Sequence, residues 1–580
     1  MKKIYFVTVF CALVSLSISS CKKESFLDQT QSTTLNEQTV FADSAYTMNF
    51  LNGIYSDVGF SSSPTRFSNI YTTYPGLESA CDESEAYVSG GGNTFIQFVS
   101  GTVNSSIVSK DAWQNCYSDI RAVNMFLKHL PTAPLTVTLK KRVKAEARFL
   151  RAWYYFILVE HYGGVPLVGD TLYTASDVIP QVRDTYEKCV NYITQECDSA
   201  AAYLPWVQTG NEYGRVNKAA CKSLKARILL YAASPLFNGG GIATSEPLKS
   251  LTGYPTYDKT RWKLAQDAAL EVMGGQYSLY IDNTTAPGYG FYKVFTLRKS
   301  SEMIFAKMKD NNRDLEDIWL PPSTMSKPIT FPYLEFINAF GMNNGLPITD
   351  PASGYDSNNP YSNRDPRFNY SVIHDQTPVM RRPEIMQFPV NLYIDATNPS
   401  KVTSGVDAIY KGTLTGYYPY KMVDQTVAPS WFNTLTPRCM PLIRYAEVLL
   451  NFAEARNEYL DAPDQQVYDA VEAIRQRAGL NPYKLTAGLT QADMRKVIQT
   501  ERRVELAFEG HRFWDVRRWK IASQTDNVMM HGTEPTKTAS GTTYKTIEVR
   551  KHNFVDKMYL WPIPESEVSK DPKLLQNPGY

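Results

Sequence analysis

Apolar residues that recur every three or four positions fill long stretches of this sequence, and this spacing restricts the possible fold most. One such series runs from Leu139 to His161, and aromatic side chains make its second half apolar nearly all round. A helix of that kind is buried between other helices. Gly163-Gly164 and Pro166 follow directly and stop it. The sequence therefore predicts a mainly α-helical protein.

The same spacing predicts further helices, several of which end just before a glycine or a proline, as helices commonly do. They are expected at about 111–130, 182–203, 217–234, 260–273, 441–459, 465–478 and 491–509. Successive helices of this length indicate a tetratricopeptide-like frame of helix pairs. No clean repeat of about 34 residues is present, however, so the helices alone do not specify a family.

Between about 276 and 440 the helical pattern fails, and Pro, Gly, Asn, Ser and Tyr accumulate. Loops of this length in a compact domain are usually functional or disordered, and the aromatic residues argue against disorder. We therefore expect a large irregular, loop-rich subdomain inserted into the helical frame. The predicted divisions are a leader at 1–20, an N-terminal helical region at 21–275 and a C-terminal region at 276–580. The last region should continue with helices at about 441–520 and end in an irregular tail.

The first twenty residues have the pattern of a lipoprotein leader. Two lysines precede an apolar run over 4–18, which is too short to span a membrane. The junction Ser20-Cys21 then resembles the cleavage box of bacterial lipoproteins, in which the cysteine carries the lipid. Several acyl chains anchor a protein stably where one would not. We therefore predict lipidation at Cys21, with a plain secretory leader as the alternative.

Charge and cysteine content narrow the possible partners. The 580 residues include 60 basic and 58 acidic ones, a net charge of +2, whereas nucleic-acid-binding proteins usually carry a clear basic excess. The cysteines beyond Cys11 and Cys21 show no CxxC or zinc-site spacing. Cys189 and Cys197 would lie about 12 Å apart on one helix, too far for a disulfide. No nucleic-acid partner, disulfide framework, metal site or cofactor is predicted.

Motifs of enzymes are missing from the sequence. It contains no G-x-S-x-G, H-E-x-x-H, Walker A or G-x-G-x-x-G pattern. Glu501, Glu505 and Glu509 recur every four residues near several arginines, which indicates either catalytic carboxylates or buried ion pairs. We favour ion pairs with arginines of neighbouring helices, because enclosed charges need partners. The same interpretation applies to Glu146 with Arg151, Glu447 and Glu454. A glycosidase pair from distant parts of the chain stays open.

Several segments stand out by their motifs and by their order along the chain. They are Ala145–Leu167, Lys218–Phe237, Asp365–Arg367, Ile443–Ala455, Glu501–Trp519 and Leu560–Pro564, the last near the end Asn577–Tyr580. Together they resemble the SusD/RagB family of Bacteroidetes outer-membrane lipoproteins and cover nearly the whole mature chain. Most of these motifs look structural, and Trp514, Trp519 and Trp561 are expected in the core.

The resemblance implies a protein that binds glycans and catalyses no reaction. Such a protein sits on the cell outer membrane through its lipid, facing the exterior. It captures oligosaccharide or polysaccharide and delivers it to a SusC-like TonB-dependent transporter. The alternatives are a helical scaffold that binds only protein, a family member that takes peptides, and a glycoside hydrolase.

The family's ligand surface is similar to a shallow platform built from early loops and the irregular subdomain. A sugar site needs an exposed aromatic face and polar side chains that meet hydroxyl groups. Trp319 is the leading stacking candidate because polar residues surround it at 311–317, although a packed tryptophan is the alternative. The other candidates are Tyr74, Asp82, Tyr87, Asn93, Phe95, Tyr292 and Tyr333.

Overall fold

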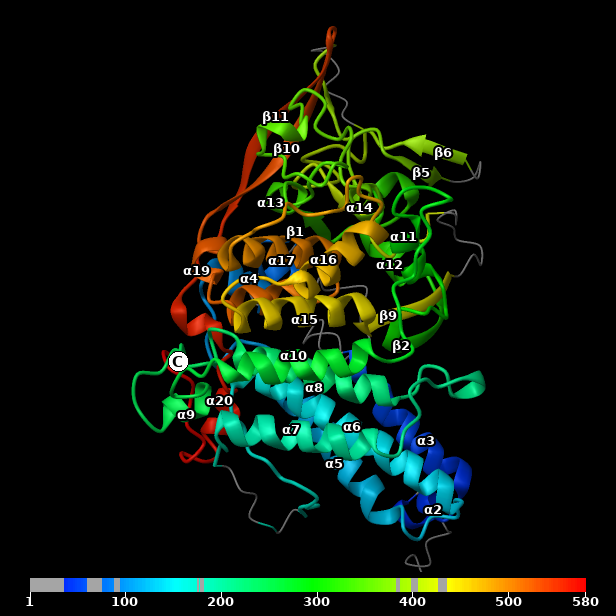
Figure 1. The fold of residues 1–580 in the computed structure, drawn as a ribbon, viewed down its shortest axis with the longest axis vertical. Coiled ribbons are helices and arrows are strands. Elements are labelled where there is room, and N and C mark those ends of the chain that lie inside the picture. The colour runs from blue at the N-terminus through cyan, green and yellow to red at the C-terminus, as the bar shows by residue number, and fades with distance from the viewer. Residues whose placement is uncertain are drawn as a thin grey trace, which may run out of the picture.

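Helices stacked along the long axis of the molecule form its frame (Figure 1). The computed structural model describes residues 36–59, 76–87, 94–174, 177, 182–381, 386–397, 405–425 and 436–580. The frame helices are α2 (Glu37–Phe41), α3 (Ser44–Tyr55), α4 (Thr94–Ser100), α5 (Asp111–His129), α6 (Val137–Tyr162), α7 (Tyr186–Ala201), α8 (Lys218–Ala233), α9 (Leu248–Thr252), α10 (Thr260–Met273), α15 (Tyr445–Tyr459), α16 (Gln465–Arg477), α17 (Gln491–Glu505), α18 (Arg512–Arg518), α19 (Ala522–Thr525) and α20 (Glu565–Val568).

Local sequence signals set most of these helix ends. Thr136, Thr185 and Asn217 each cap the first turn of a helix with a side-chain oxygen that accepts a backbone N–H. Gly163, at φ 78°, follows the last residue of α6. The mainly α-helical prediction is confirmed, and α5 to α8 and α10 lie within a few residues of the expected ranges, whereas α9 was not predicted.

Two helices differ from the prediction because of tertiary contacts. The helix expected from 441 begins only at Tyr445, since residues 436–444 form a strand. The helix expected to reach 509 ends at Glu505, and Phe508 adopts a left-handed backbone at φ 58°. Gly510 therefore does not cap this helix, and Glu509 lies beyond its end.

The inserted subdomain, residues 274–444, lies between α10 and α15, which pack against each other. Its helices and strands are short, as the sequence predicts. They are α11 (Tyr289–Thr296), β2 (Met303–Asn312), α12 (Asp314–Trp319), β3 (Thr330–Pro332), α13 (Leu334–Ile337), α14 (Pro366–Ser371), β4 (Val372–Ile373), β5 (Pro378–Arg381), β6 (Met386–Pro389), β7 (Ile394–Asp395), β8 (Tyr418–Pro419) and β9 (Thr436–Arg444). β2 pairs antiparallel with β9, so the two ends of the subdomain meet at its base.

Segments far away in the sequence complete this subdomain. β1 (Ser84–Ala86) pairs antiparallel with β3. The hairpin of β10 (Met529–Thr538) and β11 (Gly541–Lys551) extends past the helices at one end of the molecule, and β10 pairs in parallel with β7 (Figure 1). Early and late segments of the chain therefore both pair with strands of the inserted subdomain.

Apolar residues form one large core in the helical frame and a second core in the inserted subdomain. Trp153, Trp514 and Trp561 are buried in the first core. The second contains Trp319 and Phe508, and Phe508 connects it to the segment after α17. The prediction that Trp514, Trp519 and Trp561 are buried is confirmed. All six cysteines of the described chain are buried and unpaired, as expected from their spacing.

Candidate functional site

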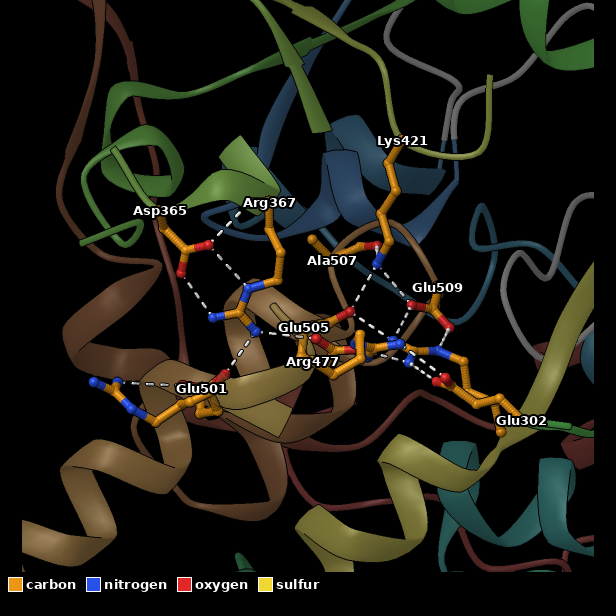
Figure 2. A network of polar contacts seen from close by, with 11 residues as sticks. Glu302, Asp365, Arg367, Lys421, Arg477, Glu501, Glu505, Ala507 and Glu509 are labelled. Carbon is orange, nitrogen blue, oxygen red and sulfur yellow. Dashed lines mark hydrogen bonds and ion pairs between the residues drawn. The ribbon is translucent and has the colours of Figure 1, made fainter. Parts of the chain in front are cut away.

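The glutamates singled out in the sequence belong to a buried charge network between α17 and the inserted subdomain (Figure 2). Acids and cations are present in equal numbers. The acids are Glu302, Asp365, Glu501, Glu505 and Glu509, and the cations are Arg367, Lys421, Arg444, Arg475 and Arg477.

Arg367 links the inserted subdomain to α17. Its guanidinium group lies 2.7 Å from Asp365, 2.6 Å from Glu501 and 3.0 Å from Glu505. Figure 2 shows Arg367 and Lys421 extending toward these glutamates. Lys421 donates to Glu509 at 2.7 Å and to the carbonyl oxygens of Glu505 and Ala507. The subdomain is therefore attached to the frame by charges as well as by apolar packing.

Glu505 lies at the centre of the network and is fully buried. Arg444 approaches it to 2.6 Å, and Arg477 and Arg367 also contact it. Burial alone would raise the pKa of Glu505, but the guanidinium groups of Arg477, Arg444 and Arg367 outweigh it and hold the pKa far below its usual range. Glu505 is thus a carboxylate fully used in ion pairs.

The other conspicuous acids are paired in the same way. Glu447 contacts Arg227 at 2.6 Å, Glu454 contacts Arg518 at 2.5 Å, and Glu146 contacts Arg215 at 2.9 Å. Arg151 pairs with Glu196. The prediction of ion pairs is confirmed for these acids and for Glu501, Glu505 and Glu509, but the expected pairing of Glu146 with Arg151 is wrong, since each has another partner. Carboxylates held by buried cations give structural support to the fold.

The leading sugar-binding candidate is buried. Trp319 is only 2% exposed and lies 5.6 Å from Phe508 between ring centres, within the second core. Its polar neighbours in sequence misled the prediction, because the short helix α12 directs Leu315, Ile318 and Trp319 inward. The expectation of an exposed stacking surface at Trp319 is therefore wrong.

Four further candidates are also buried. Asp82 is held by Arg512, with donor–acceptor distances of 2.8 and 2.7 Å. Burial would raise the pKa of Asp82, but Arg503 and Arg512 hold it at about 2. Tyr333 donates its hydroxyl to Glu85 at 2.9 Å. Phe95 and Tyr292 are each 3% exposed. None of these four side chains presents the open face that the prediction required.

Tyr74, Asn93 and Cys21 lie outside the described residues. The remaining candidate, Tyr87, is 64% exposed. It directly follows β1, and its backbone N–H donates to the carbonyl oxygen of Ile329 at 3.0 Å. Tyr87 thus stands at the surface where an early segment meets the inserted subdomain, and its role as a ligand residue stays a prediction.

Exposed apolar side chains that the sequence analysis missed stand on neighbouring loops. Met325 is 62%, Val406 57% and Tyr410 62% exposed. The backbone N–H of Ser323 donates to Asp407 at 2.7 Å and joins the two loops. Together with Tyr87, we name Met325, Val406 and Tyr410 the exposed platform. For Tyr410 the sequence held a signal of an irregular loop, because Gly405 and Gly412 lie on either side of it.

Two members of the exposed platform adopt an unusual backbone. Met325 and Tyr410 both have φ 66°, in the left-handed region that bulky residues rarely occupy. Such strain persists when the surrounding structure imposes it, and it is enriched at functional sites. The hydroxyl of Tyr410 donates to Glu534 of β10 at 2.7 Å, which fixes the ring in place. The platform therefore presents a positioned aromatic face beside a carboxylate.

Comparison with known proteins agrees with this architecture. The family model SusD family matches residues 301–580, and the model described as starch-binding associating with outer membrane matches residues 25–230. The curated SusD-like protein P2 of Formosa agariphila is 34% identical over 145 residues, which is 24% of this chain and 25% of that protein. The matched stretch thus spans a quarter of that relative.

Solved structures share the fold over nearly the whole chain. A SusD-like protein from Bacteroides fragilis NCTC 9343 is 26% identical with a TM-score of 0.75, over 93% of this chain and 98% of the other. The surface glycan-binding protein A of Bacteroides thetaiotaomicron is 17% identical with a TM-score of 0.63, over 93% and 100%.

The fold defines a helical-repeat protein of a class of binding proteins. The chain belongs to the SusD/RagB family. That family is associated with the outer membrane. Within the described residues, no helix has the length and apolar character needed to cross a membrane. Within the same residues, no group of His, Cys, Asp and Glu could hold a metal ion.

Proposed function

We propose that this protein is a lipid-anchored, surface-exposed glycan-binding protein. It captures oligosaccharide or polysaccharide, delivers it to a SusC-like TonB-dependent transporter and cleaves nothing. The starch-binding family model and the glycan-binding name of a structural neighbour support this proposal. The observation that carries it is the exposure of Tyr87 and Tyr410, at 64% and 62%: the first lies on an early segment that pairs with the inserted subdomain, and the second on a loop within it.

The chemistry of the exposed platform suits a sugar ring. Pyranose rings have apolar faces that stack on aromatic rings and hydroxyl groups that need polar partners. Tyr87 and Tyr410 supply the aromatic faces, and Glu534 supplies an acceptor beside Tyr410. Each stacking contact contributes about 1 kcal/mol. Several such contacts give the moderate affinity that suits a protein that must release its ligand to a transporter.

Replacement of the platform tyrosines tests the site. Glycans that bind the mature protein are first found with a polysaccharide panel. Tyr87→Ala and Tyr410→Ala should each weaken binding by about tenfold in calorimetry, since about 1.4 kcal/mol is a factor of ten. Tyr203→Ala is the matched control, because Tyr203 is 61% exposed on the helical frame. Equal affinity of the two platform variants and the wild type would contradict the proposal.

The anchor and the absence of cleavage have separate tests. Cys21→Ala should abolish labelling with radioactive palmitate and release the protein from outer-membrane fractions. Incubation of the purified protein with its glycan should release no reducing sugar.

Delivery requires that the SusC-like partner co-purifies from detergent-solubilised outer membranes with the wild-type protein. Loss of glycan uptake on deletion of this protein, with the transporter still present, would support that step.

A further inference from the structure

A cavity of about 900 Å³ lies where α11, α14 and the loop after α16 meet. This volume is within the range of about 300–1,000 Å³ typical of small-molecule sites. The cavity shares no lining residue with the exposed platform, so it is a second candidate site.

Side-chain amides dominate the polar lining of this cavity. They are Asn343, Asn369, Gln376, Gln387, Gln425 and Asn481. An amide both donates and accepts hydrogen bonds, which matches the hydroxyl groups of a sugar. The Nε2 atom of Gln425 is buried and has no hydrogen-bond partner among the described residues. An unpaired buried donor is costly, and an acceptor on a ligand would satisfy this nitrogen.

Aromatic rings form part of the wall. Tyr361, Tyr370 and Tyr420 line the cavity, and Tyr361 stacks on His374 with 4.1 Å between ring centres. Nδ1 of His374 lies 2.8 Å from the carbonyl oxygen of Asp375. Burial lowers the pKa of His374 to about 4, so the ring is neutral near pH 7. Nδ1 then carries the proton that this carbonyl accepts, which leaves Nε2 as an acceptor.

The described side chains that line the cavity include a positive charge and no negative one. Among the described residues that line the cavity, Arg364 is the only charged side chain. Arg364 is 4% exposed and donates to the carbonyl oxygens of Ile337, Phe340, Pro360 and Gly341, and no described carboxylate forms an ion pair with it.

The acidic residues nearest to Arg364 in the sequence interact with other partners. Asp365 pairs with Arg367 at 2.7 Å, and Asp375 accepts from the backbone N–H of Leu392 at 2.8 Å. Arg364 is therefore a buried cation without a direct counter-ion, and low-dielectric walls strengthen the effect of its charge on an anion nearby.

We propose that this cavity is a second saccharide site, selective for sugars that carry an acidic group, either a carboxylate as in uronic acids or a sulfate. The amides and His374 meet the hydroxyl groups, and the field of Arg364 and the donor of Gln425 favour the acidic group. The proposal concerns this cavity alone and does not depend on the exposed platform.

Modified ligands test the selectivity without any change to the protein. Short galacturonate oligosaccharides and their methyl esters differ in charge and by one methyl group at each carboxyl group, and a sulfated galactose oligosaccharide and its desulfated form make a second pair. The mature wild-type protein should bind the charged member of at least one pair about tenfold more tightly, with an affinity that falls as salt rises. The pair that responds identifies the acidic group. Equal affinity within both pairs, or no binding of either charged sugar, would overturn the proposal.

A charge placed in the cavity tests the location. Asn369 is exposed at the wall, so Asn369→Asp adds a carboxylate with little change in shape. The variant should bind the charged oligosaccharide about fivefold to tenfold more weakly and the neutral form unchanged. Asn191→Asp is the matched control, because Asn191 is exposed on α7. Unchanged binding by Asn369→Asp, with loss of binding in Tyr410→Ala, would show that acidic sugars use the platform instead and would refute the cavity site.

Discussion

Glu505 shows how the surroundings of one residue decide its role. In the sequence it is one of three regularly spaced glutamates, for which ion pairing was the favoured interpretation and catalysis the alternative. In the fold it is completely buried and shared by Arg367, Arg444 and Arg477. A carboxylate so enclosed cannot exchange protons with a substrate, and its value lies in neutralising the buried guanidinium groups.

Removal of Glu505 should therefore destabilise the protein strongly. Glu505→Ala leaves buried cations without their partner, and such a loss costs about 3–5 kcal/mol. Glu548→Ala, a change at an exposed glutamate of β11, should alter the free energy of unfolding by no more than about 0.5 kcal/mol. Thermal unfolding of the two variants gives the comparison. Similar melting temperatures for both would mean that the network adds nothing to stability.

The pKa of Glu83 is shifted upward, opposite to that of Glu505. Glu83 is 1% exposed, and burial together with nearby Glu78 raises its pKa from 4.5 to about 8. A group whose pKa is higher in the folded state binds more protons when folded, so its contribution to stability is lost as pH rises between those two values. Burial also raises the pKa of Asp119 to about 8 and, with Asp82 nearby, that of Asp526 to about 7.

These shifts predict that the melting temperature falls as pH rises from about 6.5, the ordinary histidine pKa, to 8. The buried histidines oppose this fall only in part: they are neutral in the folded protein, and in the unfolded chain they are about half protonated at pH 6.5 and almost neutral at pH 8. In Glu83→Gln the fall should be smaller, since glutamine cannot ionise. Thermal scans of both proteins across this window measure the difference. A variant whose profile runs parallel to that of the wild type would show that Glu83 is not protonated in the folded protein.

At the scale of elements, the start of α8 joins the frame to the inserted subdomain. Asn217 caps this helix by accepting from the N–H of Ala220 at 2.8 Å. Its amide nitrogen also donates to the hydroxyl of Tyr277 and to the carbonyl oxygen of Ile304, each at 3.0 Å. The side chain of Asn217 thus caps the start of α8 and also holds two residues of the inserted subdomain, Tyr277 and Ile304.

Asn217→Ala should cost more than the loss of an ordinary cap. A cap alone is worth about 1 kcal/mol, and an unsatisfied buried acceptor adds about 1–3 kcal/mol. We expect a total of about 2–4 kcal/mol. Thr185→Ala removes the exposed cap of α7 and should cost only about 1 kcal/mol. Chemical denaturation measures both values, and equal costs would show that the contacts with Tyr277 and Ile304 are unimportant.

At the scale of the whole molecule, two apolar cores are joined by the buried charge network. Arg367 and Lys421 belong to the inserted subdomain, and their glutamate partners belong to α17 and the segment after it. Phe508 packs on Trp319 across the same boundary. Because separation would expose charges and aromatic rings together, neither core should be stable alone.

The protein should therefore unfold in a single thermal transition. Trp319→Ala, which leaves a cavity in the second core, should lower that one transition, with a cost of about 3–5 kcal/mol. Tyr410→Ala is the exposed counterpart and should change stability by no more than about 0.5 kcal/mol. Calorimetry distinguishes the outcomes. A separate early transition in Trp319→Ala, with the helical frame still folded, would show that the cores are independent.

The sequence by itself determined the helical frame. Apolar periodicity and stop residues such as Gly163 are local signals, and local signals fix helix ends when caps satisfy the backbone. The glutamates and arginines of its motifs also predicted buried ion pairs, because charged side chains that are enclosed by apolar helices need partners of opposite charge. The irregular region was recognised by the failure of the helical pattern.

Only the tertiary structure decided which side chains face solvent in that region. Trp319 follows a polar stretch and Tyr410 follows the apolar pair Ala408-Ile409, yet the first is 2% and the second 62% exposed. Irregular loops have no period that separates an inner from an outer face, so their burial depends on packing against distant segments such as Phe508. For the same reason α17 stops at Glu505, where Lys421 and Arg444 hold the turn that follows.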